Sequence, residues 1–312
     1  MTAEVVSSAS WASSSLTDGL LEPGPITVVG GATHRDVGGV TDPATRPITA
    51  PSSVIEPQPT ELLVRVDAGV TLESLDAELA ALGQRVVLDG QRMATVGGVL
   101  AVGRSGICRL GDGHVRDALV GGTMVGADGI RFAIGGSTVK NVSGFDLCRL
   151  MVGSLGVLAC FETVLLRTIP RSGFSQWMMG PTDPTVVMAI LDRPASVLWD
   201  GIDAWVLVRG GHAQVDDDVN RLADLRMIPV AGPPDLPPHR WSLRPSQLAE
   251  LGRNDADEGR FVAEMGVGVV HRTEPAPTVA IAHGVATLHR RLRDHFDPDR
   301  RLNPGKQLAG VS

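Results

Sequence analysis

The sequence predicts an α+β protein that contains two domains. A chain of 312 residues is long enough for one large domain or two domains of medium size. Up to Pro170, short β-rich runs alternate with apolar stripes at helical spacing and with glycine-rich loops. After Pro170 this pattern of strands, helices and glycine loops stops, because residues 172–184 form an irregular stretch. We therefore place a domain boundary next to Pro170.

Composition excludes several classes of protein. The chain is 43% hydrophobic and 20% charged, which is normal for a soluble globular protein. A net charge of −7 argues against a nucleic-acid-binding surface, which needs a basic footprint. No apolar run approaches the length that spans a bilayer, and the first residues lack a signal-peptide pattern, so we expect a cytoplasmic protein.

Cysteine usage argues against a metal or disulfide site. Cys108, Cys148 and Cys160 form no C-x-x-C pair, so they predict neither a disulfide framework nor a zinc or iron–sulfur site. We interpret them as reduced thiols in the core. The chain has no tyrosine, which removes tyrosine as a catalytic acid or base.

The first half of the chain reads as strands and capped helices. Residues 1–24 are rich in Ser and Ala, and we expect a disordered tail or a frayed helix over 11–21. Residues 61–70 alternate as a half-buried strand does, and Thr71 is a good N-cap for the helix that follows. The apolar stripe of this helix consists of Leu72, Leu75, Leu79 and Leu82, and Gly83 ends the helix. A short strand is expected at 85–88. Two further strands, at 115–125 and 130–134, are expected to form a hairpin through the turn at 126–129.

The second half predicts a smaller set of elements. Three aspartates, at positions 216–218, are expected in the first turn of a helix, where they favour the helix dipole. Consecutive residues point in different directions on a helix, so we interpret them as a solvated helix start rather than a metal site. The expected elements are a helix at 184–191, a strand at 204–209, a helix at 215–225, a helix capped by Ser246, a strand over 261–270 ending at His271, and an amphipathic helix at 279–296.

A β-rich run at 26–29 opens directly into a glycine-rich loop at 30–39. Such a loop presents backbone N–H groups with no side chains in the way, and a nest of this kind binds phosphate oxygens. An ordinary glycine-rich turn explains the pattern equally well. The spacing is not G-x-G-x-x-G, and no G-x-x-x-x-G-K-[ST] occurs, so neither a Rossmann site nor a P-loop is indicated.

A second glycine signal lies at 94–106. Thr95 is a good N-cap for a helix that begins with Gly97 and Gly98 near its start. A helix N-terminus without side chains carries partial positive charge and suits a diphosphate. The alternative is a packed Gly/Ala helix with no ligand.

The third signal runs from 137 to 158. A small-residue loop at 140–145 contains the single cation Lys140, and Asp146 can cap a short helix with apolar residues three to four apart. Glycines at 153 and 156 then precede an apolar run over 157–169, which predicts a buried strand. Glycines on both sides of a helix let a backbone lie close against a large flat ligand.

These segments resemble the signature of FAD-binding flavoproteins of the vanillyl-alcohol oxidase or PCMH type, in particular the FAD-binding subunit of bacterial glycolate oxidase and the D-2-hydroxyacid dehydrogenases. The resemblance rests on residues 140–147 with 153–157, on 94–98 and on the loop from Gly30, and it resumes at 297–306. It implies a two-lobed FAD-binding domain with a smaller α+β cap domain. The implied domains are a tail at 1–24, the FAD-binding domain at 25–171 plus 285–312, and the substrate or cap domain at 172–284. The family has an extra strand and helix before its first glycine loop, so the first lobe is expected either to be trimmed or to begin upstream.

The resemblance implies non-covalent FAD and a set of cofactor residues. Ala32 stands where relatives often carry a third glycine, and Arg104 stands where they carry a smaller residue. His34 allows the alternative of a covalent histidyl–flavin bond. The implied cofactor-binding residues are Gly30, Gly31, Ala32, Thr33, His34, Ala94, Thr95, Val96, Gly97, Gly98, Gly103, Ser105, Gly106, Lys140, Gly144, Asp146, Gly153, Gly156, Val157 and Asn303.

The resemblance also implies oxidation of a small 2-hydroxy acid, such as glycolate or D-lactate. Hydride transfer to flavin N5 needs a base for the hydroxyl proton, and His271 is the first candidate, with His34 second. An arginine is the expected partner of the substrate carboxylate. No metal site is expected, because the His-cluster spacing of metal-dependent relatives is absent. The electron acceptor is expected on a separate iron–sulfur subunit, through which the protein would be peripheral to a membrane. A self-sufficient alcohol oxidase and a non-catalytic FAD-binding subunit are the alternatives.

Overall fold

The computed structural model describes residues 15–136, 146–251, 261–277 and 281–308. The chain forms two compact units. The first contains Met1–Ser105, His114–Pro170 and Val279–Val311, and the second contains Gly106–Gly113 and Arg171–Thr278. The change of unit after Pro170 lies next to the boundary that the sequence indicates, whereas the short excursion at 106–113 carries no sequence signal. Assignment of the second unit as a substrate cap remains a prediction.

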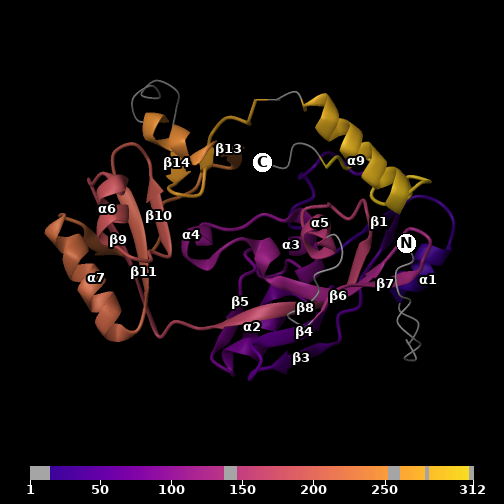
Figure 1. Ribbon diagram of the computed structural model, residues 1–312, viewed down its shortest axis with the longest axis horizontal. Helices are drawn as coiled ribbons and strands as arrows, with labels where there is room; N and C mark the ends of the chain where they lie inside the picture. The colour runs from indigo at the N-terminus through magenta and orange to yellow at the C-terminus, as the bar shows by residue number, and fades with distance from the viewer. Residues whose placement is uncertain (1–14, 137–145, 252–260, 278–280, 309–312) are drawn as a thin grey trace. The chain divides into compact units, whose positions relative to one another are not determined.

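The first unit is built on a six-stranded sheet (Figure 1). Its central strand β8, Cys160–Pro170, is eleven residues long and pairs antiparallel with β4, β6 and β5. The strand expected at 157–169 therefore begins three residues later, because Leu155 and Gly156 have positive φ and form a turn. The other strands are β3 Ile55–Gln58, β4 Leu63–Asp67, β5 Gln84–Val86, β6 Leu119–Val125 and β7 Arg131–Gly135.

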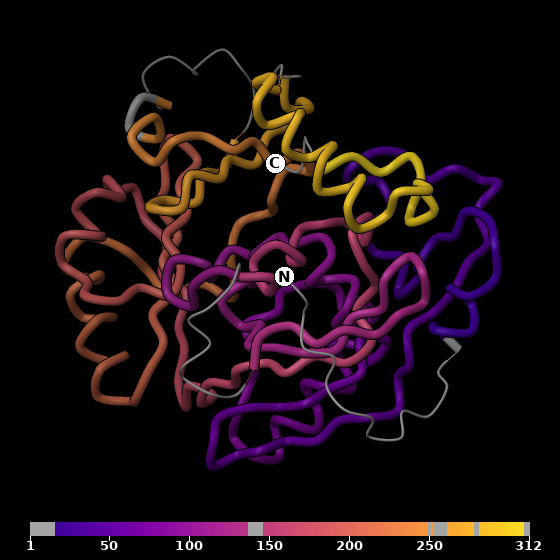
Figure 2. Tube along the Cα trace, turned by 45° about the vertical axis from the view of Figure 1, so that its right-hand side comes forward, coloured from indigo at the N-terminus to yellow at the C-terminus, as the bar shows by residue number. Residues whose placement is uncertain are grey.

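A two-stranded parallel sheet completes the β structure of this unit. It pairs β1, Ile26–Val28, with β2, Arg46–Ile48. The C-terminal segment returns to β1, because Leu302 forms a parallel bridge with Ile26. Figure 2 shows the yellow C-terminal part of the trace running close to indigo parts from the first 50 residues. The first unit is thus discontinuous in sequence.

The helices of the first unit begin where the sequence places their caps. The side chains of Thr71, Thr95 and Asp146 accept backbone N–H groups of the helices α2, Leu72–Ala80, α3, Val96–Val102, and α5, Leu147–Met151. The remaining helices are α1 Ser15–Leu21, the 3-10 helix η1 Val115–Asp117 and α9 His283–Phe296. Of the two alternatives for residues 1–24, a disordered tail or a helix over 11–21, the structure has the helix over Ser15–Leu21, where Leu16 and Leu20 are fully buried.

The second unit is a seven-stranded antiparallel sheet in the order β12-β9-β11-β10-β14-β15-β13. Helices α6 and α7 pack against it (Figure 1). The strands are β9 Phe174–Gly180, β10 Ser196–Trp199, β11 Ala204–Gly210, β12 Ile228–Val230, β13 His239–Ser242, β14 Phe261–Glu264 and β15 Val269–Arg272. The helices are α4 Arg109–Asp112, α6 Pro184–Ile190, α7 His212–Asp224 and the 3-10 helix η2 Pro245–Glu250.

Four predictions for this unit are wrong. Residues 261–270 form the hairpin β14–β15 instead of one strand, because Gly266 and Gly268 have φ of 75° and 87° and turn the chain. The stretch expected to be irregular contains β9, which pairs antiparallel with β11 along its whole length. Helix α7 begins at His212, which puts the aspartates beyond its first turn. Arg244 rather than Ser246 is the N-cap of η2.

Each unit has a hydrophobic core of its own. Strands β4, β6 and β8 pack on α2 and α3 through buried residues such as Val66, Leu75 and Leu100 in the first unit. The second core includes Met178, Val206 and Leu222. Two separate cores are the physical basis for treating the two units as separate folding elements.

Candidate functional site

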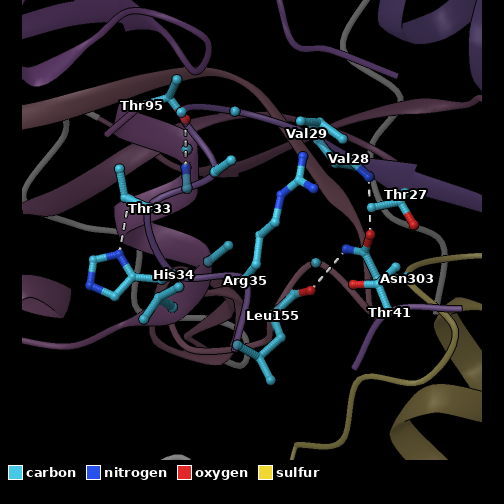
Figure 3. Close-up of a pocket in the computed structure, with 18 of the residues that line it drawn as sticks. Thr27, Val28, Val29, Thr33, His34, Arg35, Thr41, Thr95, Leu155 and Asn303 are labelled. Carbon is cyan, nitrogen blue, oxygen red and sulfur yellow. Dashed lines mark hydrogen bonds between the residues drawn. The ribbon is translucent and has the colours of Figure 1, made fainter. Parts of the chain in front are cut away.

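The first unit contains a cavity of about 1070 Å³. It is lined by the loop that follows β1, by the segment at the start of α3, and by residues next to Leu155 and Asn303 (Figure 3). A volume of this size is at the upper end of the range for small-molecule and cofactor sites. The cavity is therefore our candidate functional site.

Two glycines at the cavity are required by contact between loops. A Cβ atom on Gly30 would lie 2.2 Å from Thr95 Oγ1, and one on Gly31 would lie 1.8 Å from the carbonyl oxygen of Met93. Any side chain there would push the loop after β1 away from the segment that starts α3. Ala32, which follows them, has φ of 55°, in the left-handed region that favours glycine. The glycine pattern at 30–32 thus has a packing origin as well as a place at the cavity.

The N–H groups at the start of α3 already have partners. The Val96 and Gly97 N–H groups donate to the carbonyl oxygens of Val70 and Ala68, at 2.9 and 2.8 Å. The Gly98 N–H donates to Thr95 Oγ1 at 3.2 Å. Carbonyl oxygens of a neighbouring segment of the first unit and the Thr95 side chain thus accept these three N–H groups. The expectation that residues 94–98 hold the diphosphate stays a prediction.

Gly97 and Gly98 differ in what surrounds them. A Cβ on Gly97 would lie 2.8 Å from Ala68 Cβ, so packing forbids a side chain. A Cβ on Gly98 would meet only Thr95 Oγ1, at 3.0 Å. Gly98 lines the cavity, so the absence of a side chain there leaves space in the cavity, whereas at Gly97 it leaves space for Ala68.

Asn303 ties three segments together at the edge of the cavity. The Val28 N–H donates to its Oδ1 at 3.0 Å, and its Nδ2 donates to the Leu155 carbonyl oxygen at 2.9 Å (Figure 3). A Cβ on Gly156 would lie 2.5 Å from that Nδ2 atom. Because both ends of the amide are engaged, Asn303 shapes the site through these contacts.

The structure separates the residues that the sequence singles out into groups. Ten lie at the cavity, and the contact of each with a cofactor remains a prediction: Gly30, Gly31, Ala32, Thr33, His34, Thr95, Gly97, Gly98, Gly156 and Asn303. Lys140 and Gly144 lie outside the described residues. Gly106 and His271 belong to the second unit.

The other residues lie away from the cavity lining, for structural reasons. Ala94, Val96 and Val157 are buried in the hydrophobic core. Asp146 caps α5. Ser105 Oγ accepts the Val115 N–H at 3.0 Å. A Cβ on Gly103 would lie 2.7 Å from Gly153 Cα, so this pair of glycines holds the end of α3 against the turn after α5.

Two cavity residues carry no signal in sequence reasoning. Lys306 comes 271 positions after Arg35, yet its Nζ donates to the carbonyl oxygens of Arg35, Val37 and Gly39. Burial lowers the pKa of this ammonium group. Arg35 itself lines the cavity beside the glycines. Both residues lie next to glycine-containing segments that the sequence singles out, but only the fold brings Arg35 and Lys306 together.

The second unit contains a buried cluster of ionisable groups. His271 Nε2 lies 2.9 Å from Glu264 Oε1, and Arg240 Nη2 lies 3.5 Å from the same oxygen. The strand register places His271 opposite both Arg240 and Val262, so these side chains share one face of the sheet. Glu264 is 1% exposed, and its Oε2 has no hydrogen-bond partner among the described residues. A buried carboxylate with an open acceptor is suited to a donor from a ligand.

Comparison with known proteins identifies the segment that contributes most of the cavity lining. Residues 22–135 match the protein family described as FAD binding domain. This segment is an FAD-binding domain of the PCMH type. The match contains the loop after β1, the start of α3 and the sheet strands β3 to β7. The prediction of FAD as the cofactor is confirmed.

The chain is related to FAD-linked oxidoreductases. It is 31% identical over 150 residues to glycolate oxidase subunit GlcE of Escherichia coli (strain K12), a match that covers 47% of this chain and 43% of the relative. It is 33% identical over 149 residues to a D-lactate dehydrogenase of Archaeoglobus fulgidus, covering 47% and 34% of the two chains. The alignments thus span less than half the length of these curated relatives.

A solved structure shows the same fold over most of the chain. An alkyldihydroxyacetonephosphate synthase superposes with a TM-score of 0.66 and 15% sequence identity, covering 90% of this chain and 71% of the other. At this identity the likeness concerns the fold alone. In the described part of the chain, no helix combines the length and the apolar character needed to cross a bilayer. No group of three or more His, Cys, Asp or Glu side chains among the described residues is arranged to hold a metal ion.

FAD fits the cavity on structural grounds. The loop 30–34 presents backbone where side chains are excluded, and Gly98 leaves an open surface opposite it. The lining includes apolar residues such as Val29, Ala101 and Phe161, as a site for a cofactor with large aromatic rings requires. We therefore expect FAD in this cavity, and the contact of each lining residue with the cofactor stays a prediction.

Proposed function

We propose that the protein is an FAD-dependent oxidoreductase that oxidises a small 2-hydroxy acid of the glycolate or D-lactate kind. The proposal is supported by the FAD-binding domain together with the buried Arg240–Glu264–His271 cluster, which is the observation that carries it. The names of the relatives, a glycolate oxidase subunit and a D-lactate dehydrogenase, point to the same substrate class.

His271 is the proposed base. If the Glu264 carboxylate accepts the hydrogen on His271 Nε2, the tautomer is set and Nδ1 becomes the acceptor for the hydroxyl proton of the substrate. Arg240 is the proposed partner of the substrate carboxylate, because a guanidinium binds that group through paired hydrogen bonds. When bound, FAD supplies the hydride acceptor.

Flavin bleaching tests the proposal. The holoprotein, mixed anaerobically with glycolate, D-lactate or L-lactate, should lose its flavin absorbance with one of the first two. The variant His271→Asn should bleach about 100-fold more slowly or worse, because general base catalysis contributes at least that factor. His239→Asn, an exposed histidine on the neighbouring strand β13, is the matched control and should bleach at the normal rate.

The outcomes separate the candidate functions. Equal bleaching rates for His271→Asn and the native protein would remove His271 from the reaction. No bleaching with any 2-hydroxy acid would favour the alternative of a non-catalytic FAD-binding subunit, which the partial match to a subunit of glycolate oxidase also permits.

We propose that the protein acts within a larger complex and passes electrons to a separate iron–sulfur subunit. On this proposal the complex is cytoplasmic and reaches a membrane only through that partner. The proposal predicts that the protein turns over substrate with an artificial electron acceptor but not with oxygen. Adding the partner subunit should then allow turnover without the artificial acceptor. Full turnover with oxygen alone would indicate a self-sufficient oxidase.

We further propose that FAD is held non-covalently. His34 Nδ1 lies 3.0 Å from Thr33 Oγ1, so one ring nitrogen already has a hydrogen-bond partner. Acid precipitation should release the flavin into the supernatant. Flavin that stays in the pellet would instead indicate a covalent bond to His34.

A further inference from the structure

The charged side chains at the FAD cavity do not contribute equally. Those that line it are His34, Arg35, Asp36, Asp42 and Lys306. FAD brings a negatively charged diphosphate, which the two aspartates would repel. A cation must therefore offset both the diphosphate and the aspartates, and only Arg35 and Lys306 carry a permanent positive charge among these residues.

Lys306 is fully engaged by the protein. An ammonium group has three hydrogens, and its Nζ donates to three carbonyl oxygens, those of Arg35, Val37 and Gly39. The bond to Val37 is 2.9 Å long and the bond to Gly39 is 2.6 Å long. Lys306 therefore fixes the backbone of the loop at 35–39 and has no hydrogen left for a phosphate.

Arg35 is in the opposite situation. Within the described parts of the chain, no carboxylate or other acceptor pairs with its guanidinium group. In Figure 3 its side chain extends across the cavity, with Thr33 and Thr95 on one side and Val28 and Asn303 on the other. Because Lys306 holds the Arg35 carbonyl oxygen, the backbone that carries this side chain is fixed in place.

The loop that carries Arg35 also has open backbone donors. The N–H groups of Gly30, Gly31, Ala32 and Thr33 have no hydrogen-bond acceptor among the described residues, whereas those at the start of α3 are paired. The donors suited to a diphosphate are thus found on the loop at 30–35, next to the unpaired guanidinium.

We propose that Arg35 binds the diphosphate of FAD and makes the site selective for FAD over flavins without that group. A guanidinium offers a planar set of donors that matches two phosphate oxygens at once. The glycines bring the backbone close, and Arg35 supplies the charge. The proposal rests on the FAD-binding domain and is independent of the substrate.

Equilibrium binding tests the role of Arg35. FAD and riboflavin are titrated into the flavin-free full-length chain, with quenching of flavin fluorescence as the signal. Arg35→Gln should raise the Kd for FAD about 10- to 100-fold, the loss expected for a charge-assisted hydrogen bond, and leave the Kd for riboflavin unchanged. Arg35→Lys should give an intermediate loss, because an ammonium keeps the charge without the planar donors.

Salt and a matched control complete the test. The Kd for FAD should rise with ionic strength in the native protein and much less in Arg35→Gln. Arg290→Gln removes an exposed arginine on α9, away from the cavity lining, and should change neither Kd. An unchanged Kd for FAD in Arg35→Gln, or equal weakening of FAD and riboflavin, would overturn the proposal.

Discussion

At the residue scale, the glycines of the site fall into two kinds. Gly30, Gly31 and Gly97 are required because a side chain would collide with another part of the protein. Gly98 is different, because a Cβ there would meet only the oxygen of its own N-cap residue. Glycine content alone does not separate these two kinds, since both occur in one run of sequence.

Gly98→Ala tests whether the open space at Gly98 is used by FAD. The methyl group adds bulk at the cavity, and alanine is the better helix former, so we expect at least a tenfold higher Kd for FAD with little loss of stability. Gly284→Ala is the matched control, because it adds a methyl group in open space within the first turn of α9. A normal Kd for FAD in Gly98→Ala, measured by the same fluorescence titration, would place FAD elsewhere in the cavity.

At the element scale, one buried ion pair joins the β6–β7 hairpin to the central strand. Arg131 on β7 donates to both carboxylate oxygens of Glu162 on β8, at 2.8 and 2.9 Å. The side chains are 18% and 6% exposed. The hydrogen bond to Glu162 raises the pKa of Arg131. This pair therefore connects two strands that are not neighbours in the sheet order.

Glu162→Gln should destabilise the first unit by about 3 kcal/mol, because it removes the negative charge that pairs with the largely buried Arg131 guanidinium. Urea unfolding followed by circular dichroism measures the change. The control is Glu56→Gln, whose partner Arg65 forms an exposed pair on β3 and β4. That substitution should cost about 0.5 kcal/mol or less. Equal losses in both variants would contradict a special role for the Arg131–Glu162 pair.

At the scale of the whole molecule, the two units have separate cores and separate spectroscopic reporters. Four of the five tryptophans, at positions 177, 199, 205 and 241, belong to the second unit, and Trp11 lies outside the described residues. FAD, in contrast, is proposed to bind in the cavity of the first unit, which contains the FAD-binding domain. Tryptophan and flavin fluorescence therefore follow different parts of the molecule.

Thermal unfolding should show two transitions that respond differently to FAD. Free FAD at about 100 times its Kd adds about 2.7 kcal/mol to the unit that binds it. We expect the transition seen by flavin release to move up with FAD concentration, while the transition seen by tryptophan fluorescence moves much less. Coincident transitions that shift together would show that the two units unfold as one.

Local physics explains what the sequence predicts correctly. The N-caps at Thr71, Thr95 and Asp146, the hairpin at 126–129 and the long apolar strand β8 each depend on a few neighbouring residues. The FAD-binding domain follows from loops whose glycine spacing is local as well. Where a pattern has two local solutions, prediction fails, as for the hairpin β14–β15, which reads equally well as one strand.

The sequence by itself determined the FAD-binding domain, the strands and capped helices around it, and the change of unit after Pro170. Only the tertiary structure decided which donors are open to the cofactor. The carbonyl oxygens of Ala68 and Val70 accept two N–H groups at the start of α3. Lys306 donates its ammonium hydrogens to carbonyl oxygens of the loop that carries Arg35. Hydrogen-bond donors are used up by partners that are distant in sequence, so which of them stay available is a property of the folded chain.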